Sequence, residues 1–522
     1  MRARETGVLI VGGGAAGTML SLELARHSVA ARTVDRLAGP GGTSRAIAVH
    51  ARTLELLERI DRRLLEPFLE RGIRNKGYVL HYVDAAGGRS EVRPGLDFTT
   101  LDSRYPYILI HGQSDTETYI RDYLRQEYGR ATEWNTECAA VAQDADGVTA
   151  TLVHAGRGGE EERVRCRYLV ACDGINSRVR QALGLEQEGS DYKGTVLQNM
   201  DVYLDGFPDA EDYVHYCAGT DHFIMVVKLP GGFFRLLLSD RGEAADPNIP
   251  PQDAFMRVVA RHFDGVSLGE LVWHSRWESW VRLAKNYREG RVFLAGDSAH
   301  VHSTTGGQGM NCCMQDACNL GWKLAYVLQG IAKAELLDSY VDERRPIAEQ
   351  VIWAASSLHE IFMAHGKDIR ERAERMNDPA FLGQVVGRCS GISYTYRDYL
   401  RPIEGLAEQP GPAIGDRAAD ANLGGGRTLY DLMRHTRFTL LLLRGTGTRG
   451  DNGSEALERF NKRFGHVVET HEICSAGDIE RHYGSTPHDR LYLVRPDGYI
   501  GFRGALTELT LLESHLVSVV LP

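Results

Sequence analysis

The chain has 522 residues, of which 43% are hydrophobic and 25% are charged, and its formal net charge is −10. This composition is that of an ordinary globular protein, and the length predicts about three domains. The negative charge argues against a nucleic-acid-binding protein and against attraction to anionic membranes. The nine cysteines show neither metal-ligand spacing nor a secreted disulfide framework, so we expect reduced thiols.

An uncharged stretch from Gly7 to Leu22 follows Arg2 and Arg4 and has the outline of a signal peptide. Its glycines instead have the spacing of a dinucleotide-binding turn, and no clear cleavage site precedes Glu23. No apolar run reaches the ~18 residues that a membrane-spanning helix needs. We therefore predict a cytoplasmic protein without a membrane span.

The first part of the chain predicts a βαβ unit followed by a mixed region. The predicted elements up to residue 188 are a strand at 7–11, a helix at 15–27, a strand at 30–35, a β-rich insertion at 77–107, a helix at 116–127, and strands at 148–154 and 163–171. We interpret residues 1–188 as the first part of a nucleotide-binding domain.

The pattern changes over 189–286. Two apolar runs, 223–227 and 233–238, flank Pro230-Gly231-Gly232, which predicts a hairpin and an antiparallel sheet. Residues 287–400 return to the first domain with a strand at 291–295, and the stretch 312–380 is strongly helical.

A Pro- and Gly-rich break at 401–426 predicts a linker. The last predicted domain, 427–522, has an apolar run at 438–443, a helix at 453–464, a strand at 466–468 and a hairpin at 491–500.

The first glycine motif, Gly12-x-Gly14-x-x-Gly17, follows a predicted strand and opens a predicted helix. Gly12 allows the tight turn, Gly14 lets a pyrophosphate approach the helix N-terminus, and Gly17 allows close helix–strand packing. Asp35 lies 18 residues after Gly17, at the end of the second strand, where a carboxylate accepts ribose hydroxyls. The spacing predicts a dinucleotide site; the alternative is a tight turn without a ligand.

Two further motifs are typical of the same kind of ligand. Asp173-Gly174 ends a predicted strand, although alone it also fits a surface turn. Asp297 ends another strand, where it can accept from a ribityl or ribose hydroxyl. The glycines at 306, 307 and 309 then expose backbone N–H groups that favour negative charge on a reduced flavin.

With these motifs, the chain resembles the single-component FAD-dependent aromatic hydroxylases, the para-hydroxybenzoate hydroxylase and phenol hydroxylase superfamily, and most of all the tailoring hydroxylases of aromatic polyketides. The matching stretches are Gly12 to Gly17, Ser44-Arg45, Arg52 to Glu55, Gln113 with Glu117, Asp173-Gly174, Arg288 to Asn311, Asp316, Asn319 to Leu324, and Glu343 to Pro346. The resemblance implies an α/β plus β fold. It consists of a Rossmann-like FAD-binding domain, an antiparallel-sheet substrate domain and a C-terminal thioredoxin-like domain.

The resemblance also implies the cofactor-binding residues. They are Gly12, Gly14, Ala15, Ala16, Gly17, Asp35, Arg36, Arg45, Gln113, Asp173, Gly296, Asp297, Gly307, Gly309, Met310 and Asn311. In such enzymes NADPH or NADH reduces FAD, O2 gives a flavin C4a-hydroperoxide, and a phenolic or polycyclic aromatic ring attacks it. The expected partner is an aromatic small molecule, and a homodimer is left open. Neither a nucleophile triad nor a metal is needed, and we expect no metal.

The resemblance does not fix the catalytic side chains, and we name five candidates: His50, Tyr216, His222, Arg235 and Thr304. Thr304 stands where the family has a proline, which frees φ and adds a hydroxyl. Tyr216, His222 and Arg235 are candidates by domain only, as are Phe223, Phe234 and Trp277. Core packing or a satisfied surface group is the simpler interpretation of each of these six. His300 and His302 flank the flavin loop; we interpret His300 as structural.

Several alternatives stay open on the same scaffold: a catabolic phenol-type hydroxylase, Baeyer–Villiger oxygen insertion, a non-oxygenating flavin oxidoreductase, and an FAD-shaped protein that only binds a partner. A flavin-dependent halogenase is disfavoured, because Trp277 and Trp280 have the wrong spacing for its signature and no proline follows. The C-terminal domain has only Cys474 and no Cys-x-x-Cys, so it cannot perform dithiol exchange. We interpret that domain as structural or as an interaction surface.

Overall fold

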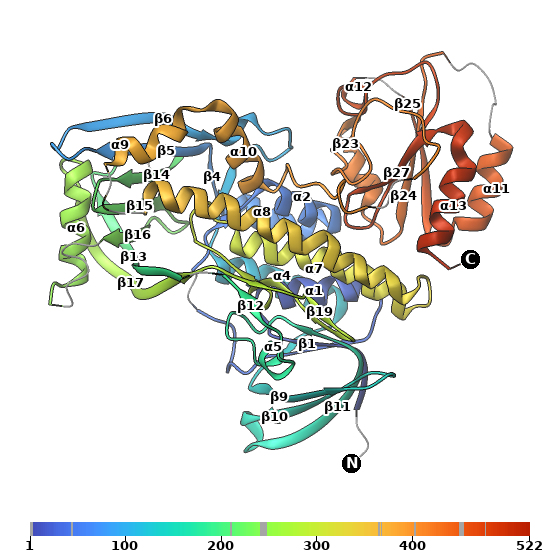
Figure 1. Cartoon of the computed structure of the whole chain (residues 1–522), viewed down its shortest axis with the longest axis horizontal. Coiled ribbons are helices and arrows are strands. Elements are labelled where there is room, and N and C mark those ends of the chain that lie inside the picture. The colour runs from blue at the N-terminus through green and yellow to red at the C-terminus, as the bar shows by residue number, and fades with distance from the viewer. Residues whose placement is uncertain are drawn as a thin grey trace.

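A computed structural model describes residues 4–42, 45–189, 191–208, 211–240, 248–363, 366, 368–400, 403–447, 454–474 and 477–521. Ser44, Pro402 and Gly453, which belong to the matching stretches or predicted segments, lie outside these residues. Three lobes surround two long central helices, α7 (Gly309–Leu328) and α8 (Asp338–Phe362) (Figure 1).

The first lobe contains an eight-stranded sheet in which β20, β11, β1, β2 and β8 run parallel in that order. The predicted βαβ unit is confirmed by β1, the helix α1 (Ala15–Arg26) and β2. The strands are β19 (Arg288–Glu289), β20 (Val292–Leu294), β11 (Glu160–Ala171), β1 (Arg4–Val11), β2 (Ala31–Val34), β8 (Thr132–Glu133), β10 (Val148–His154) and β9 (Thr136–Gln143).

Helix α1 is buried on almost every side, because its small and apolar residues pack between the sheet, α7 and α4. The other helices of this lobe are α2 (Ala51–Ile60), α3 (Arg62–Arg71), α4 (Gln113–Tyr128) and α5 (Arg178–Ala182). Strands β3 (Ala48–Val49), β7 (Ile108–Ile110) and β4 (Ile73–Asn75) form a three-stranded sheet. In the chain, β3 directly precedes α2 and β4 directly follows α3. A second small sheet joins β12 (Gln187–Glu188), β18 (Arg282–Ala284) and β21 (His300–Val301).

The second lobe is a seven-stranded sheet, and the predicted hairpin is confirmed by its antiparallel strands β15 and β16. Its order is β17 (Ser267–Trp280), β13 (Asp191–Asp205), β16 (Phe234–Asp240), β15 (His222–Lys228), β14 (Tyr213–Ala218), β5 (Gly77–Val83) and β6 (Arg89–Asp97). The sheet is mixed rather than fully antiparallel, because β14 and β5 run parallel. The insertion near 77–107, which we assigned to the first domain, therefore completes the sheet of the second.

The two faces of this sheet are covered by different helices. On one face, alternate residues of the strands pack with α6 (Pro251–His262). On the other face they pack with α8, α9 (Ile369–Arg372) and α10 (Pro379–Ser390). This second face carries Tyr78, Tyr216 and Phe223, and it is the face that meets the first lobe near the loop before α7.

The C-terminal lobe has a four-stranded sheet in the order β25 (Val468–Cys474), β24 (Phe438–Arg444), β26 (Arg490–Val494) and β27 (Ile500–Ala505). Strands β24 and β25 are parallel, and the other pairs are antiparallel. Its helices are α11 (Ser454–Phe464), α12 (Asp478–Tyr483) and α13 (Leu509–Val519). The predicted strand at 466–468 begins only at Val468 and runs on to Cys474.

The segment predicted as a linker is hydrogen-bonded along much of its described length. A short hairpin of β22 (Asn422–Gly424) and β23 (Arg427–Thr428) ends it. Gly415 N–H donates to the carbonyl of Ile500, and Ala418 N–H donates to the carbonyl of Gly498. The segment therefore packs along the edge of the C-terminal lobe and does not form a free linker between lobes.

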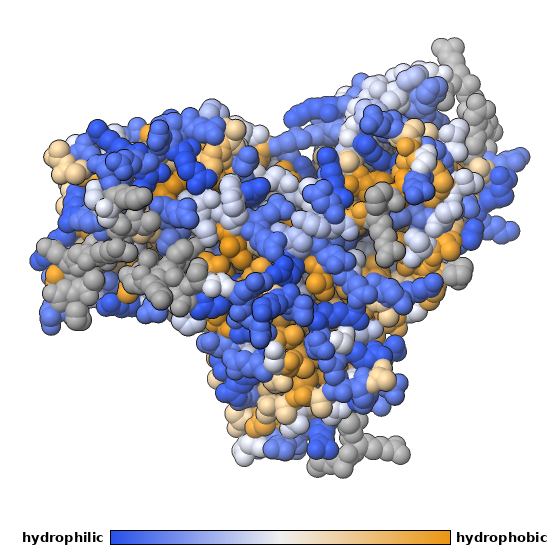
Figure 2. Space-filling model, viewed as in Figure 1, coloured by the Kyte–Doolittle hydropathy of each residue, from blue (hydrophilic) through white to orange (hydrophobic). Residues whose placement is uncertain are grey.

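Hydrophilic residues cover most of the visible outer surface, and apolar residues show mainly in the hollows between lobes and on the lower lobe (Figure 2). Among the described residues, none of the helices combines the length and the apolar character needed to cross a membrane.

Candidate functional site

The three glycine-containing motifs lie at the carboxyl ends of three neighbouring parallel strands, β1, β11 and β20. A Cβ on Gly12 would lie 2.1 Å from the carbonyl oxygen of Cys172, directly before the second motif. A Cβ on Gly296, in the third motif, would lie 3.0 Å from the Cβ of Ala16. Motifs that are far apart in the sequence thus share one cleft edge, which is where open parallel sheets bind nucleotides.

The first motif forms a tight turn with an open helix end. Gly12 has a φ of +109°, and a Cβ on Gly17 would lie 1.9 Å from the carbonyl oxygen of Gly12. A Cβ on Gly14 would instead meet only Glu117 Oε1, at 3.8 Å, so the space in front of the α1 N-terminus is free of close protein atoms. This geometry suits an anion at the helix N-terminus.

Asp35 holds the same turn from the next strand. Its Oδ2 accepts a hydrogen bond of 2.7 Å from Gly13 N–H, and its Oδ1 accepts one of 2.8 Å from Leu37 N–H. Arg36, which follows it, is exposed. Each carboxylate oxygen keeps a second lone pair, so Asp35 can still accept from a ligand hydroxyl.

Arg45 and Gln113 lie close together, because Gln113 contacts Ala46, the residue after Arg45. Gln113 starts α4 and donates from Nε2 to Glu117 Oε1 at 2.9 Å, while its Oε1 accepts from Ala46 N–H at 3.4 Å. Arg45 is exposed, and its charge is one of the influences that lower the pKa of Asp297.

Asp173 and the following turn are tied to the third motif. The Oδ2 of Asp173 accepts from Arg178 N–H at 2.9 Å, and burial raises the pKa of its carboxyl. Arg180 donates from Nη1 to the carbonyl of Ser298 at 2.8 Å. This guanidinium links the second motif directly to the turn that contains Asp297.

The third motif combines an exposed carboxylate with an open helix start. Asp297 lies in the 3-10 turn Gly296–Ser298, and its side chain is exposed. The surrounding protein nevertheless desolvates the carboxyl group and raises its pKa. Cys313 Sγ lies 3.4 Å from its Oδ1. A Cβ on Gly309, the first residue of α7, would meet nothing within 4 Å, so the N–H groups of Gly309 and Met310 lie at an uncrowded helix end.

The loop before α7 is locked to the first lobe. Gly306 and Gly307 have φ values of +87° and +65°. Asn311 donates from Nδ2 to the carbonyls of Ala48 and Gly307 at 2.9 and 3.0 Å and accepts from His50 N–H at 2.9 Å. The Asn311 side chain thus fixes the backbone of this loop to the β3–α2 segment.

Three of the five catalytic candidates, His50, Tyr216 and Thr304, belong to this loop or contact it. His50 is buried, and its Nε2 is 2.9 Å from the carbonyl oxygen of Gly306. Burial lowers the pKa of His50 to about 4, so the ring is neutral at pH 7. With the proton on Nε2, its Nδ1 is a bare acceptor, and among the described residues this atom has no hydrogen-bond partner.

Tyr216 approaches from the second lobe and accepts a 3.4 Å hydrogen bond from Gly306 N–H. Thr304 is two residues before Gly306, and its buried Oγ1 has no partner. Arg235 is buried, forms a two-pronged ion pair with Asp201 and donates from Nη1 to the carbonyl of Arg45 at 3.3 Å. Arg235 therefore connects the substrate-domain sheet to the Arg45 loop.

His222 does not belong to this group. Its Nε2 lies 2.8 Å from His262 Nε2 on α6, which covers the other face of the seven-stranded sheet. The correction follows from strand alternation: Phe223 points toward the flavin-loop side, so its neighbour His222 points away. Phe234 lies on the same outer face as His222, while Trp277 packs against the inner face.

Three residues that the sequence interpretation did not single out complete the inner face. Phe98 stacks on His50 with ring centroids 5.7 Å apart, and Tyr78 lies 4.6 Å from Tyr216. Cys389 Sγ lies 2.8 Å from where a Cβ on Gly306 would be. No local sequence signal marks them, because they come from the insertion and from α10 and meet the loop only in the folded chain.

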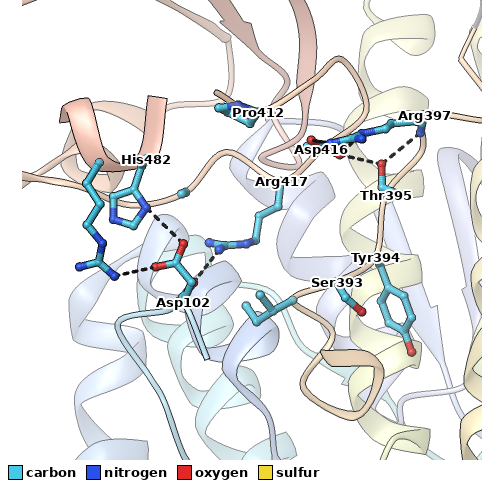
Figure 3. Close-up of a pocket in the computed structure, with 12 residues that line it drawn as sticks. Asp102, Ser393, Tyr394, Thr395, Arg397, Pro412, Asp416, Arg417 and His482 are labelled. Carbon is cyan, nitrogen blue, oxygen red and sulfur yellow. Dashed lines mark hydrogen bonds and ion pairs between the residues drawn. The ribbon is translucent and has the colours of Figure 1, made fainter. Parts of the chain in front are cut away.

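A separate pocket of about 420 Å³ lies where the C-terminal lobe meets the first lobe (Figure 3). Its basic groups already have partners: Arg481 and His482 reach the carboxylate of Asp102, and Arg397 pairs with Asp416. None of the cofactor-motif residues lines it. We therefore place the functional site at the motifs and not in this pocket.

The motif cleft has the features that an FAD molecule requires: an open helix N-terminus at Gly14, a second at Gly309, and an exposed acid at Asp297 between them. Near Gly306, His50 Nδ1 and Thr304 Oγ1 are buried and find no hydrogen-bond partner among the described residues.

Comparisons with known proteins agree with this geometry. The family description "FAD binding domain" matches residues 5–355, and "Aromatic-ring hydroxylase, C-terminal" matches residues 411–520. The chain is 37% identical to pentachlorophenol 4-monooxygenase of Sphingobium chlorophenolicum over 98% of this chain and 96% of that protein. It is 32% identical to 6-methylpretetramide 4-monooxygenase of Streptomyces rimosus over 98% and 92% of the two chains.

Among solved structures, the anhydrotetracycline hydroxylase OxyS of Streptomyces rimosus superposes with a TM-score of 0.75 at 28% identity, covering 99% of both chains.

Proposed function

Because the chain belongs to the FAD-binding aromatic-ring hydroxylases and is a flavin-dependent aromatic monooxygenase, we propose that it uses NADPH or NADH and O2 to hydroxylate a phenolic ring. One observation carries the proposal. Three cofactor motifs share a cleft whose inner end, at Gly306, contacts buried aromatic side chains of the second lobe.

We assign the FAD chain to the motif residues in order along the cleft. Asp35 and Arg36 would hold the adenosine ribose end, and the N–H groups of Gly14, Ala15 and Ala16 would stabilise the pyrophosphate. Asp297, Arg45 and Gln113 would hold the central part of the cofactor. The N–H groups from Gly307 to Asn311 would stabilise negative charge on the flavin pyrimidine. Asp173-Gly174 supports the same cleft from β11.

The redox chemistry, namely acceptance of a hydride and activation of O2, would come from FAD when it is bound. The chain's own residues bind, orient and exclude water. Phe98, Tyr78 and Tyr216 provide a dry, aromatic surround for a planar ring. The bare Nδ1 of His50 would accept the hydrogen bond of the substrate hydroxyl, which favours the electron-rich phenolate character that ring attack needs.

Two substrate classes have specific support. The likeness to 6-methylpretetramide 4-monooxygenase supports a polycyclic phenol of natural-product biosynthesis. The higher identity to pentachlorophenol 4-monooxygenase supports a small catabolic phenol. The C-terminal lobe supports the thioredoxin-like interpretation by its strand order, with one parallel pair followed by antiparallel pairs. Its single cysteine, Cys474, restricts it to a structural or interaction role.

The test is direct. The purified protein should be yellow with bound FAD and should oxidise NADPH or NADH faster when a phenol of the right class is present. A panel of monocyclic, halogenated and polycyclic phenols under 18O2 should give one product class that carries a single 18O atom. Turnover with no 18O in any product would refute hydroxylation, and 18O in a ring-expanded lactone would indicate Baeyer–Villiger insertion instead.

A further inference from the structure

A buried charge cluster lies directly behind the Gly296–Ser298 turn. It consists of His300 on β21, Asp316 on α7 and Arg344 on α8, each at most 1% exposed. His300 Nε2 is 2.7 Å from Asp316 Oδ2, and Arg344 Nε donates to Asp316 Oδ1 at 2.7 Å. Gly296 N–H also donates to Asp316 Oδ2, at 3.2 Å. A single carboxylate thus joins the turn that carries Asp297 to two other elements.

The cluster does not have the character of a metal site, although His300, Cys312 and Asp316 bring ligand atoms close together. Arg344 donates to Asp316 and, from Nη2, to Cys312 Sγ at 3.5 Å. A guanidinium therefore already neutralises the ligands that a metal ion would use, and its charge would repel one.

The charged groups of the cluster shift one another's pKa values. Burial alone raises the pKa of Asp316, but Arg344 and His300 lower it below its ordinary value. Burial alone lowers the pKa of His300, but Cys312 and Asp316 raise it well above its ordinary value. Asp316 thus stabilises the protonated form of His300, and His300 and Arg344 stabilise the ionised form of Asp316.

The other titratable or charged groups around His300 come from every neighbouring element. They are Tyr287 and His302, whose rings stack on it, Cys312 and Cys313 on α7, Tyr340 on α8, Cys172 at the end of β11, and Arg180, which holds the Ser298 carbonyl. Asp297 is the acidic residue at the cleft surface beside this cluster. Burial raises the pKa of Asp297, and the charge of His300 is the strongest influence that opposes the rise.

We propose that His300 is a positioning residue: its imidazolium, fixed by Asp316, keeps the Asp297 carboxylate ionised and directed into the cleft, where it accepts a hydrogen bond from the cofactor. The inference rests on the proposed function, because it takes FAD as the ligand of this cleft. It gives His300 an electrostatic role, in place of the purely structural one expected from its place in the turn.

The test measures FAD binding against pH. The apoproteins of wild type, His300→Gln and His300→Lys are titrated with FAD from about pH 8.5 to about pH 6, followed by quenching of flavin fluorescence. Wild-type affinity should stay level. In His300→Gln the pKa of Asp297 rises, so the affinity should fall about tenfold per pH unit below that pKa. His300→Lys, which restores a cation, should level the profile again.

His154→Gln is the matched control, because His154 is also a buried histidine paired with a carboxylate, Glu162 at 2.9 Å, in strands β10 and β11 and outside the His300 cluster. Its FAD profile should match wild type. The double variant His300→Gln with Asp297→Asn should bind FAD weakly but without pH dependence.

The outcomes separate the two proposals. If wild type binds no FAD at any pH, the proposed function fails. If wild type binds FAD and His300→Gln has a parallel pH profile, only the role of His300 is overturned. Should His300→Gln not fold, a 15N titration of wild-type His300 decides: a neutral imidazole at pH 7 overturns the proposal, and a charged one supports it.

Discussion

Thr304 and Thr305 are neighbours in the sequence with opposite hydrogen-bonding states. Thr305 Oγ1 donates to the carbonyl of Ala355 at 2.7 Å and lies 3.0 Å from Ser303 Oγ. Thr304 Oγ1 is buried without a partner. A buried hydroxyl without a partner costs free energy in the free protein, so its retention is explained if a ligand satisfies it.

We therefore expect Thr304→Val to leave FAD content and folding unchanged, within about 0.5 kcal/mol, while KM for the aromatic substrate rises. The matched change Thr305→Val should instead destabilise the protein by about 1–3 kcal/mol, because it removes a satisfied buried hydroxyl. Flavin absorbance, denaturant midpoints and steady-state kinetics of both variants check this. An unchanged KM in Thr304→Val would show that the hydroxyl does not face the substrate.

At this scale the sequence predicts residue identity better than residue direction. The motif acids Asp35 and Asp297 were found because a short local pattern places each at a strand end. His222 was chosen by domain alone, and the fold turns it to the α6 side. Tyr78 and Cys389 were missed because their proximity to Gly306 depends on tertiary contacts between segments about 80 to 230 residues away in the chain.

At the scale of elements, the side chain of Asn311 connects α7 to the β3–α2 segment by hydrogen bonds. Its side chain is fully buried and makes three backbone hydrogen bonds, to Ala48, His50 and Gly307. The loop that precedes α7 is thereby held at a fixed distance from His50. Removing the amide would leave buried backbone groups without partners.

Asn311→Ala should therefore lower stability by about 2–4 kcal/mol and loosen FAD, because the α7 N-terminus loses its fixed position. The denaturant midpoint of the apoprotein and the fluorescence of released FAD measure the two effects separately. Asn422→Ala serves as control, since Asn422 is exposed in the C-terminal lobe and caps only Gly424 N–H at 2.8 Å. Equal FAD retention in both variants would contradict this connecting role.

Strands and helices could be predicted from the sequence where the hydrophobic periodicity was strong. Which strands pair with one another could not be predicted. The predicted strand at 148–154 coincides with β10, because alternation and flanking turns define it locally. The parallel pairing of β5 with β14 joins segments about 136 residues apart, as between Gly77 and Tyr213, and no local pattern encodes that partner. The short strand at 466–468 was underestimated because Glu469, Thr470 and His471, which are half-buried in β25, interrupt its apolar run.

At the scale of the whole molecule, two adjacent residues of α8 serve different lobes. Arg344 points into the cluster behind Asp297, whereas Glu343 points toward the C-terminal lobe. Glu343 receives two hydrogen bonds from Arg495, at 2.8 and 2.7 Å, and one from Lys323 at 2.8 Å. Asp497 extends this network to Asn319 at 3.0 Å. The first and third lobes thus share a fully buried ion network.

The pH dependence of this network follows from Glu343. Burial alone raises its pKa, but Arg495 and Lys323 lower it below the ordinary 4.5. A depressed carboxyl pKa contributes stability that is present above pH 4.5 and is lost as the pH falls toward the folded-state pKa. The stability that Glu343 contributes should therefore decline as the pH falls below 4.5, which weakens the attachment of the C-terminal lobe.

Glu343→Gln should cost about 3–5 kcal/mol at pH 7, because it leaves Arg495 and Lys323 as buried cations with only Asp497 opposing them. Urea midpoints at pH 7 and about pH 4 measure the loss, and limited proteolysis between the lobes shows where the chain opens. The difference in unfolding free energy between wild type and variant should narrow at the lower pH, because the unfolded wild-type chain then binds a proton at Glu343 that the folded protein does not. Glu455→Gln, which removes an exposed pair with Arg459, should shift the midpoint by no more than about 0.5 kcal/mol. A gap that stays constant with pH would mean that packing, and not the charge of Glu343, joins the two lobes.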